Sequence, residues 1–166
     1  RTDGADATNV QAITWCFAMA HDPAPGAVHT IDRPAQYDRW REYVPPVSPP
    51  WPGKLLSWTD CSPWTLEPRR NYLFPHEADP ASGRTGNSYF AYRQIVGARH
   101  WDVAREPHEA TLVNWPMNDY LEADLMSTDL GERRRALHES RQQALSLLYW
   151  LQTEAPNYTT GGQGYP

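Results

Sequence analysis

Amide, carboxylate and phenol side chains are concentrated in the short segment Asn114-Trp-Pro-Met-Asn-Asp-Tyr120. A carboxamide donates and accepts hydrogen bonds at once, so Asn114 and Asn118, together with Asp119 and Tyr120, are suited to orient a hydroxylated or carbonyl-containing ligand, or the edge of a flavin. The segment follows an apolar run and is stiffened by Pro116. Asn118 and Asp119 could instead bond to their own backbone in a turn, as these residue types commonly do. The residue types alone allow both interpretations.

Arg93, Tyr92 and Trp15 are further candidate binding residues. Arg93 is a charged residue that directly follows the aromatic run Tyr89-Phe-Ala-Tyr92 in an otherwise aromatic and apolar segment. A guanidinium in this position could anchor a carboxylate or another anion, or it could be half of a buried ion pair. Tyr92 and Trp15 are candidate pocket walls, because their rings combine an apolar body with a polar edge. The chain has 8 Trp and 9 Tyr but only 3 Phe, which suits pocket walls and interfaces as well as ordinary packing.

Known motifs for autonomous catalysis or metal binding do not occur in the sequence. The stretch Gly161-Gly-Gln-Gly164 follows a helical pattern, whereas a phosphate-binding glycine loop follows a strand and opens a helix. The 6 histidines lack the spacing that places two ligands on one helical face, so no metal site is expected. There is also no Gly-x-Ser-x-Gly motif and no Cys-x-x-Cys motif.

Charge and composition exclude several classes of protein. The formal net charge is −5, and the sequence has no run of basic residues that could bind along a phosphate backbone. Nucleic-acid binding is therefore not expected. No apolar run approaches the ~18 residues that cross a bilayer, which predicts a soluble protein without a membrane partner. Cys16 and Cys61 are too few for a disulfide scaffold. Because Cys16 lies in an apolar run, we expect a buried free thiol and a reducing, cytoplasmic location.

The first part of the chain predicts a single domain over residues 9–166 after a flexible lead-in over residues 1–8. Residues 10–20 are rich in β-branched and aromatic residues, with the large side chains on one face and small ones (Ala12, Thr14, Cys16 and Ala18) on the other. Both faces are expected to be buried, which predicts a central strand. Residues 31–44 have aromatic side chains near helical spacing and predict a short helix. Residues 45–86 are rich in Pro and Trp and predict an irregular surface excursion, which Tyr72, Leu73 and Phe74 help to order.

The second part predicts strands over residues 89–96, 101–104 and 109–114, followed by a long helix that ends before Pro156. Ser127 or Thr128 is the expected N-cap. Arg135 and Glu139 are expected to pair across one helical turn. The expected apolar face of this helix consists of Leu130, Leu137, Ala144, Leu148 and Leu151. The predicted fold class is therefore α+β, with an antiparallel or mixed sheet, a long C-terminal helix and loops rich in proline and aromatic residues.

The order of motifs in the chain resembles part of a bacterial family of FAD-dependent oxidoreductases. The resemblance rests on Val10-Gln-Ala-Ile-Thr-Trp-Cys-Phe-Ala18, the Tyr89 and Asn114 segments already described, Leu147-Leu-Tyr-Trp-Leu-Gln-Thr-Glu-Ala-Pro156 and Gly161-Gly-Gln-Gly-Tyr-Pro166. In that family a dinucleotide-binding segment precedes this region and a second FAD-contacting segment follows it. The chain is therefore expected to be the substrate-side region of such an enzyme, and not catalytic alone.

What the resemblance implies is hydride-transfer redox on a small organic substrate, with FAD as the cofactor and an FAD-binding domain or subunit as the partner. It also implies that Gly161, Gly162 and Gly164 lie near the flavin, although most of the cofactor would be bound by other segments. An alternative from the composition alone is a non-catalytic module that stacks exposed aromatic rings on carbohydrates or other flat ligands. A third possibility is one subunit of a naturally split enzyme.

Overall fold

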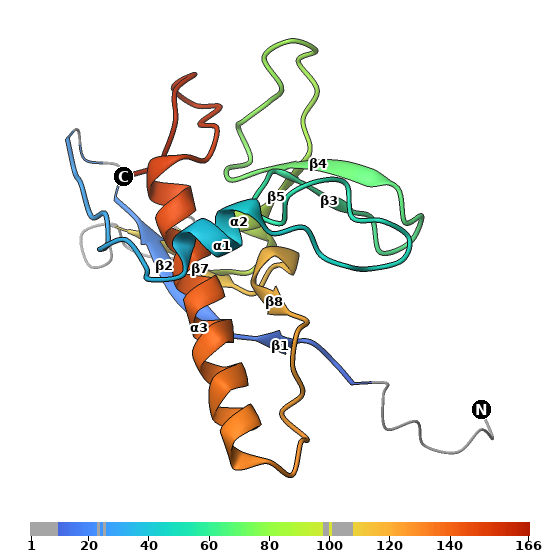
Figure 1. Ribbon diagram of the computed structural model, residues 1–166. Coiled ribbons are helices and arrows are strands. Elements are labelled where there is room, and N and C mark those ends of the chain that lie inside the picture. Colours follow the sequence, from blue (N-terminus) through green and yellow to red (C-terminus); the bar gives the residue numbers. More distant parts are fainter. Residues whose placement is uncertain (1–9, 23, 25, 98–99, 101–107) are drawn as a thin grey trace.

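The computed structural model describes residues 10–22, 24, 26–97, 100 and 108–166, and within them the fold is α+β, as predicted (Figure 1). The elements in chain order are β1 (Ile13–Thr14), β2 (Phe17–His21), α1 (Tyr37–Glu42), β3 (Thr59–Cys61), β4 (Pro68–Tyr72), β5 (Asn87–Ser88), α2 (Tyr89–Tyr92), β6 (Gln94–Val96), β7 (Glu109–Val113), the 3-10 turn η2 (Pro116–Asn118), β8 (Asp119–Tyr120) and α3 (Leu130–Thr153).

The strands of the described residues form three small sheets. The first joins β1 to β8, the second has the order β2-β7-β6, and the third has the order β3-β4-β5. All pairs are antiparallel except β4 with β5, which is parallel. The β2–β7 pairing sets Phe17 opposite Val113, and this ladder carries the chain directly into the Asn114–Tyr120 segment.

The long helix α3 confirms the predicted C-terminal helix, with a different N-cap and a different buried face. Asp129 caps it through a hydrogen bond from the Gly131 amide at 2.6 Å, in place of Ser127 or Thr128. Leu130 and Leu137 are exposed. They lie in the N-terminal half of the helix, which Figure 1 shows extending away from the sheets. The side chains that α3 buries are Ala136, Ser140, Gln143, Ala144, Ser146, Leu147, Trp150 and Leu151.

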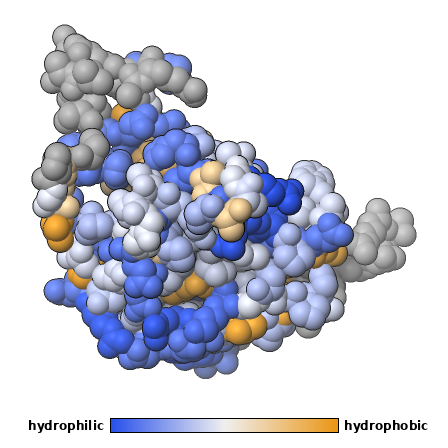
Figure 2. Space-filling view, turned by 90° about the horizontal axis from the view of Figure 1, so that it is seen from above, coloured by the Kyte–Doolittle hydropathy of each residue, from blue (hydrophilic) through white to orange (hydrophobic). Residues whose placement is uncertain are grey.

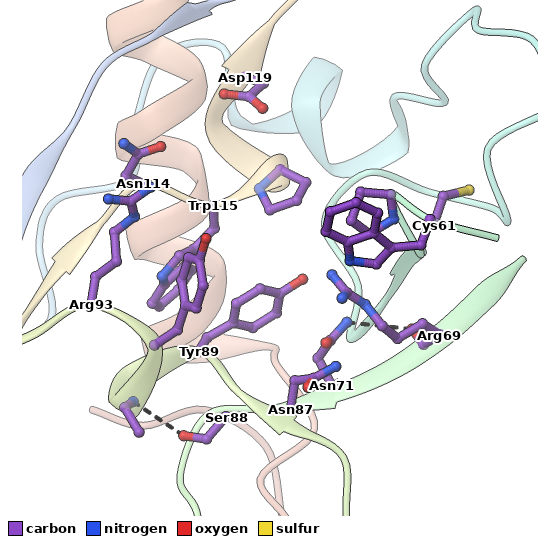
Figure 3. A pocket seen from close by; sticks show the side chains of 15 residues that line it. Cys61, Arg69, Asn71, Asn87, Ser88, Tyr89, Arg93, Asn114, Trp115 and Asp119 are labelled. Carbon is purple, nitrogen blue, oxygen red and sulfur yellow. Dashed lines mark hydrogen bonds between the residues drawn. The ribbon is translucent and has the colours of Figure 1, made fainter. Parts of the chain in front are cut away.

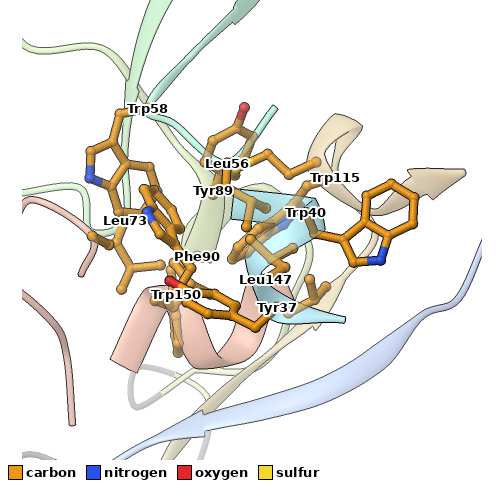
Figure 4. Close-up of a cluster of buried hydrophobic side chains, with 14 of the residues drawn as sticks. Tyr37, Trp40, Leu56, Trp58, Leu73, Tyr89, Phe90, Trp115, Leu147 and Trp150 are labelled. Atoms are coloured by element: carbon orange, nitrogen blue, oxygen red, sulfur yellow. The ribbon is translucent and has the colours of Figure 1, made fainter. Parts of the chain in front are cut away.

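An aromatic core joins the helix to the sheets and loops (Figure 4). Trp58 lies 5.2 Å from Trp150 and 6.2 Å from Tyr89, measured between ring centroids. The Trp58 indole also donates a hydrogen bond to the carbonyl of Pro156 at 2.8 Å. Buried aromatic rings of this kind contribute large apolar areas to a protein core. Trp58 thereby fixes the 45–86 region to the end of α3.

The excursion predicted over residues 45–86 is more regular than expected. It contains β3 and β4, which form a hairpin, and the ordering by Tyr72, Leu73 and Phe74 is confirmed because all three are buried. The short helix predicted within residues 31–44 is confirmed as α1.

The central strand predicted over residues 10–20 was wrong. β1 and β2 belong to different sheets, and β2 lies at the edge of its sheet. Ile13, Phe17 and Met19 pack against the core, but the opposite face is open, so Cys16 is exposed and not buried. Both cysteines are free. Small side chains on the open face gave an apolar pattern without requiring a covering layer.

The strand predicted over residues 89–96 is divided into helix α2 and strand β6. Ser88 explains the difference, because its hydroxyl accepts a hydrogen bond from the Ala91 amide and caps α2. The strand predicted over residues 109–114 is confirmed as β7. The strand predicted over residues 101–104 lies outside the described residues.

The surface carries no broad apolar face in the view from above, where hydrophobic residues form small separate spots (Figure 2). Isolated apolar residues of this kind are common on protein surfaces. Within the described residues, no helix is both long and apolar enough to cross a membrane.

Candidate functional site

A pocket of about 730 Å³ lies between the β3–β4 hairpin, the β5–α2 junction and the start of the Asn114–Tyr120 segment (Figure 3). Its volume falls within the range of ordinary small-molecule sites. Of the residues that the sequence suggested, Tyr92, Arg93, Asn114 and Asp119 line it. Segments far apart in the chain therefore meet at one hollow, and the predicted side chains come from two of them.

Ser88 sets the position of the α2 residues at the pocket. Its hydroxyl donates to the carbonyl of Leu73 at 2.9 Å and accepts from the Ala91 amide at 3.2 Å. The turn that follows buries Tyr89 and Phe90 and leaves Tyr92 exposed. One capped helical turn thus directs two aromatic rings into the core and a third toward solvent.

Aromatic rings form the apolar surface of the pocket. Tyr89 stacks on Trp115 with 4.9 Å between ring centroids and 27° between ring planes. Trp64 and Tyr92 are 90% and 67% exposed. The guanidinium of Arg93 lies 5.2 Å from the centre of the Tyr92 ring, which is a cation–π contact. A flat ligand would meet ring faces here, some rigidly packed and some free.

A buried hydrogen-bond network supports one side of the pocket. Arg69 forms two parallel bonds of 2.8 Å to Asp60, whose side chain is only 1% exposed. The hydroxyl of Tyr89 donates to the same carboxylate at 2.9 Å. Burial, and then the neighbouring Asp60 charge, raise the pKa of Tyr89 well above its usual value. Asp60, Arg69 and Tyr89 therefore use their polar groups on one another, and they serve as a rigid wall.

Asp119 is a partly buried carboxyl that lines the pocket. Its Oδ1 accepts a hydrogen bond from the hydroxyl of Thr14, its neighbour across the β1–β8 ladder. Burial raises the pKa of Asp119, and the Thr14 bond opposes that shift. The Oδ1 of Asp119 therefore stabilises the β1–β8 pairing, and the same residue also lines the pocket.

Asn118 is fully buried and stabilises the backbone around it. Its Oδ1 accepts from the Trp115 amide at 2.8 Å, and its Nδ2 donates to the carbonyls of Trp15 at 3.0 Å and Val113 at 3.4 Å. Asn118 thus bonds to the backbone of its own turn, as one of the two interpretations predicted, and it also bonds to Trp15 in the β1–β2 connection. Asn118 does not line the pocket.

Tyr120 and Trp15 also lie outside the residues that line the pocket. Tyr120 is buried, and its hydroxyl donates to Glu139 of α3 at 2.5 Å. Burial and Glu139 raise the pKa of Tyr120. Trp15 is 38% exposed between β1 and β2. The structure therefore does not bring these two rings to the pocket.

The glycine stretch forms a closed turn at the end of α3. The amide of Gly161 donates to the Asn157 carbonyl, that of Gly162 to the Thr160 hydroxyl, and that of Gly164 to the Ala155 carbonyl. A phosphate would have to displace all three bonds, so these amides do not fit a phosphate cradle. None of the three glycines lines the pocket.

Several pocket residues were not anticipated from the sequence. Asn71 and Asn87 are opposite each other across the parallel β4–β5 pair, and Cys61, Trp64 and Trp115 also line the pocket. The Oδ1 of Asn71 and the indole nitrogen of Trp115 are buried and have no hydrogen-bond partner among the described residues. The sequence does show Trp, Asn and Arg residues concentrated in the irregular stretches, and this could have marked them as candidates. These side chains meet at the pocket only because of the β3–β4 hairpin, which was not predicted.

Among the described residues, no group of three or more His, Cys, Asp or Glu side chains is placed to hold a metal ion. Comparisons of the chain with protein-family models, with curated proteins and with solved structures found no match.

Proposed function

We propose that the chain binds a small organic substrate in the 730 Å³ pocket and serves as the substrate-side region of an FAD-dependent oxidoreductase. The observation that carries the binding half is the pocket itself, in which flat aromatic surfaces alternate with amide and guanidinium groups. The oxidoreductase half is supported by the motif resemblance, several of whose segments converge on or beside this pocket.

The pocket residues divide into a rigid wall and free polar groups. The Asp60–Arg69–Tyr89 network and the Tyr89–Trp115 stack hold one wall in place. The side chains of Asn87 and Asn114 make no hydrogen bond to the described part of the chain, so they can orient a ligand. In the proposed enzyme the chain orients the substrate and excludes water, while the flavin supplies the redox chemistry.

The glycine stretch does not fit the phosphates of FAD, because the amides at 161, 162 and 164 bond within their own turn. The proposal therefore assigns FAD binding to another domain or subunit. Isothermal titration calorimetry of the chain with FAD is expected to detect no tight binding. Submicromolar binding of FAD to this chain would contradict that division of roles.

A carbohydrate-binding module is the second candidate, and the exposure of Trp64 and Tyr92 favours it. Exposed rings stack on sugars as readily as on aromatic substrates. Ligand-observed NMR with soluble xylo- and cello-oligosaccharides, compared with planar bicyclic aromatic compounds, distinguishes the two. The proposed function predicts saturation transfer to the aromatic compounds. Transfer to oligosaccharides alone, lost in Trp64→Ala, would instead support the module.

A further inference from the structure

Two described arginines line the pocket, and of these Arg93 is the one without a carboxylate partner among the described residues. Arg69 also lines the pocket, but its charge is matched by Asp60 through two hydrogen bonds of 2.8 Å. Within the described part of the chain, the side chain of Arg93 makes no ion pair, and its guanidinium contacts the ring of Tyr92. The buried ion pair considered for Arg93 is therefore not formed among these residues.

Asn114 lies beside Arg93 at the same end of the pocket. The Leu112 amide donates to the carbonyl of Arg93 at 3.0 Å, so these two residues are neighbours across adjacent segments. Asn114 is two residues after Leu112, and in an extended chain residues two apart share a face. Figure 3 shows the carboxamide of Asn114 next to the guanidinium of Arg93. Together they offer several N–H donors, which is the arrangement that binds a carboxylate.

The opposite end of the pocket has a different character. Figure 3 shows Asn71, Asn87 and Arg69 on the other side of Tyr89 from the Arg93 and Asn114 pair. The carboxamide of Asn87 is exposed and unpaired with the described residues, so it suits a neutral polar group. Between the two ends lie the ring of Tyr89 and the stacked indole of Trp115.

We propose that the substrate class of this pocket is a planar aromatic carboxylic acid, with its carboxylate held by Arg93 and Asn114. This assignment rests on the proposed function of the pocket as a substrate site. Stacking of Arg93 on Tyr92 restricts the guanidinium before a ligand arrives, which lowers the entropy lost on binding.

The test compares 2-naphthoate with its neutral counterpart 2-naphthamide by calorimetry, supported by ligand-observed NMR, on the wild-type chain and three variants. We expect naphthoate to bind about tenfold more tightly than naphthamide to the wild type, the difference made by one charge-assisted bond pair. Arg93→Gln is expected to remove that preference. Arg134→Gln, an exposed position on α3 outside the pocket, is the matched control and should preserve it.

Asn114→Asp provides a second, nearly isosteric test. A carboxylate at position 114 would occupy Arg93 and repel an anionic ligand, so naphthoate binding should fall about tenfold or more while naphthamide binding is retained. Equal binding of both probes to the wild type, no binding of either, or an unchanged preference in Arg93→Gln would overturn the assignment. None of these measurements involves a flavin, so failure of the carboxylate assignment is distinguishable from failure of the flavoenzyme proposal, which depends on where FAD binds.

Discussion

Asn114 and Asn118 are two asparagines of one segment with different surroundings. Asn118 is fully buried and its side chain makes three hydrogen bonds to backbone groups, whereas the side chain of Asn114 is half-buried at the pocket and makes none to the described residues. An unsatisfied buried backbone group costs about 1–3 kcal/mol. The first residue therefore supports the fold, and the second is available to a ligand.

Replacing Asn118 by alanine is expected to lower the free energy of unfolding by about 2–4 kcal/mol, since it leaves several buried backbone groups without partners. Asn114→Ala is the matched control and should change stability by about 0.5 kcal/mol or less. Urea unfolding monitored by circular dichroism measures both. Equal effects of the two substitutions would contradict the division of roles.

Asp119 gives a pH dependence whose sign follows from its raised pKa. Burial favours the protonated carboxyl in the folded state, so its contribution to stability is present below the ordinary carboxyl pKa and is lost as pH rises through the raised value. Asp119→Asn still accepts the Thr14 hydroxyl bond but cannot ionise. Relative to wild type, this variant is expected to gain stability between about pH 4 and pH 7.

The measurement is chemical unfolding at both pH values, with the exposed Asp32→Asn as the control. A variant whose stability relative to wild type is the same at the two pH values would show that the Asp119 carboxyl is not held in a desolvated site.

At the scale of elements, the turn after α3 depends on Gly164. Its φ is 76°, and an added Cβ would collide with the backbone carbonyl of Gln152. Gly161 has the same φ, but its Cβ would meet open space. Gly164→Ala is expected to destabilise the fold by about 3 kcal/mol or more, and Gly161→Ala by about 1 kcal/mol. Thermal unfolding compares them; a difference smaller than about 1 kcal/mol would mean that the turn is not packed against the helix end as described.

Helix α3 and strand β7 could be predicted because their signals are local. The Arg135–Glu139 pair one turn apart is present with an N–O separation of 3.7 Å. β7 ends at Val113, shortly before Pro116, which lacks an amide to donate to a ladder and begins η2. The strand prediction over residues 89–96 was wrong because a four-residue helix contains barely one helical period, and alternation over so few residues also fits a strand. Its cap, Ser88, was the informative signal.

The candidate site could be predicted only in part. Arg93, Asn114 and Asp119 stand out because polar groups interrupt aromatic or apolar runs. Asp60 and Arg69 do not, because their contact depends on the register of the β3–β4 hairpin, which pairs Asp60 with Arg69. Pairings of this kind are tertiary information that single-sequence patterns do not contain.

At the scale of the whole molecule, stability depends on tyrosine side chains that must remain neutral. Burial is the main cause of a raised pKa, to about 12 for Tyr43, and in the same direction for Tyr37, Tyr89, Tyr120, Tyr158 and Tyr165. Unfolded tyrosines ionise near pH 10. As pH rises above that value, the unfolded chain therefore loses protons that the folded chain retains, and stability falls.

We expect the unfolding midpoint in urea to fall steeply between about pH 9.5 and pH 11, and phenolate absorbance to appear together with unfolding. Tyr89→Phe should reduce the steepness of this fall, although it also removes the bond to Asp60. Phenolate absorbance that develops fully while near-UV circular dichroism remains native would contradict the burial of these rings.

The pocket is formed by segments that are far apart in the chain. The β3–β4 hairpin, the β5–α2 junction and the segment after β7 each contribute a few side chains, and the Trp58 contacts join the hairpin to α3. No single segment contains the site. A substitution in the core, away from the pocket, is therefore expected to alter ligand binding only by changing how these elements pack against one another.

The most direct test of the proposed function is the visible absorption spectrum of the protein purified natively from the cells that make it, together with the intact mass of every copurifying component. The proposed function predicts the absorption bands of an oxidised flavin, released as FAD on denaturation and held by a polypeptide segment other than the described residues. A colourless preparation that releases no flavin would contradict it.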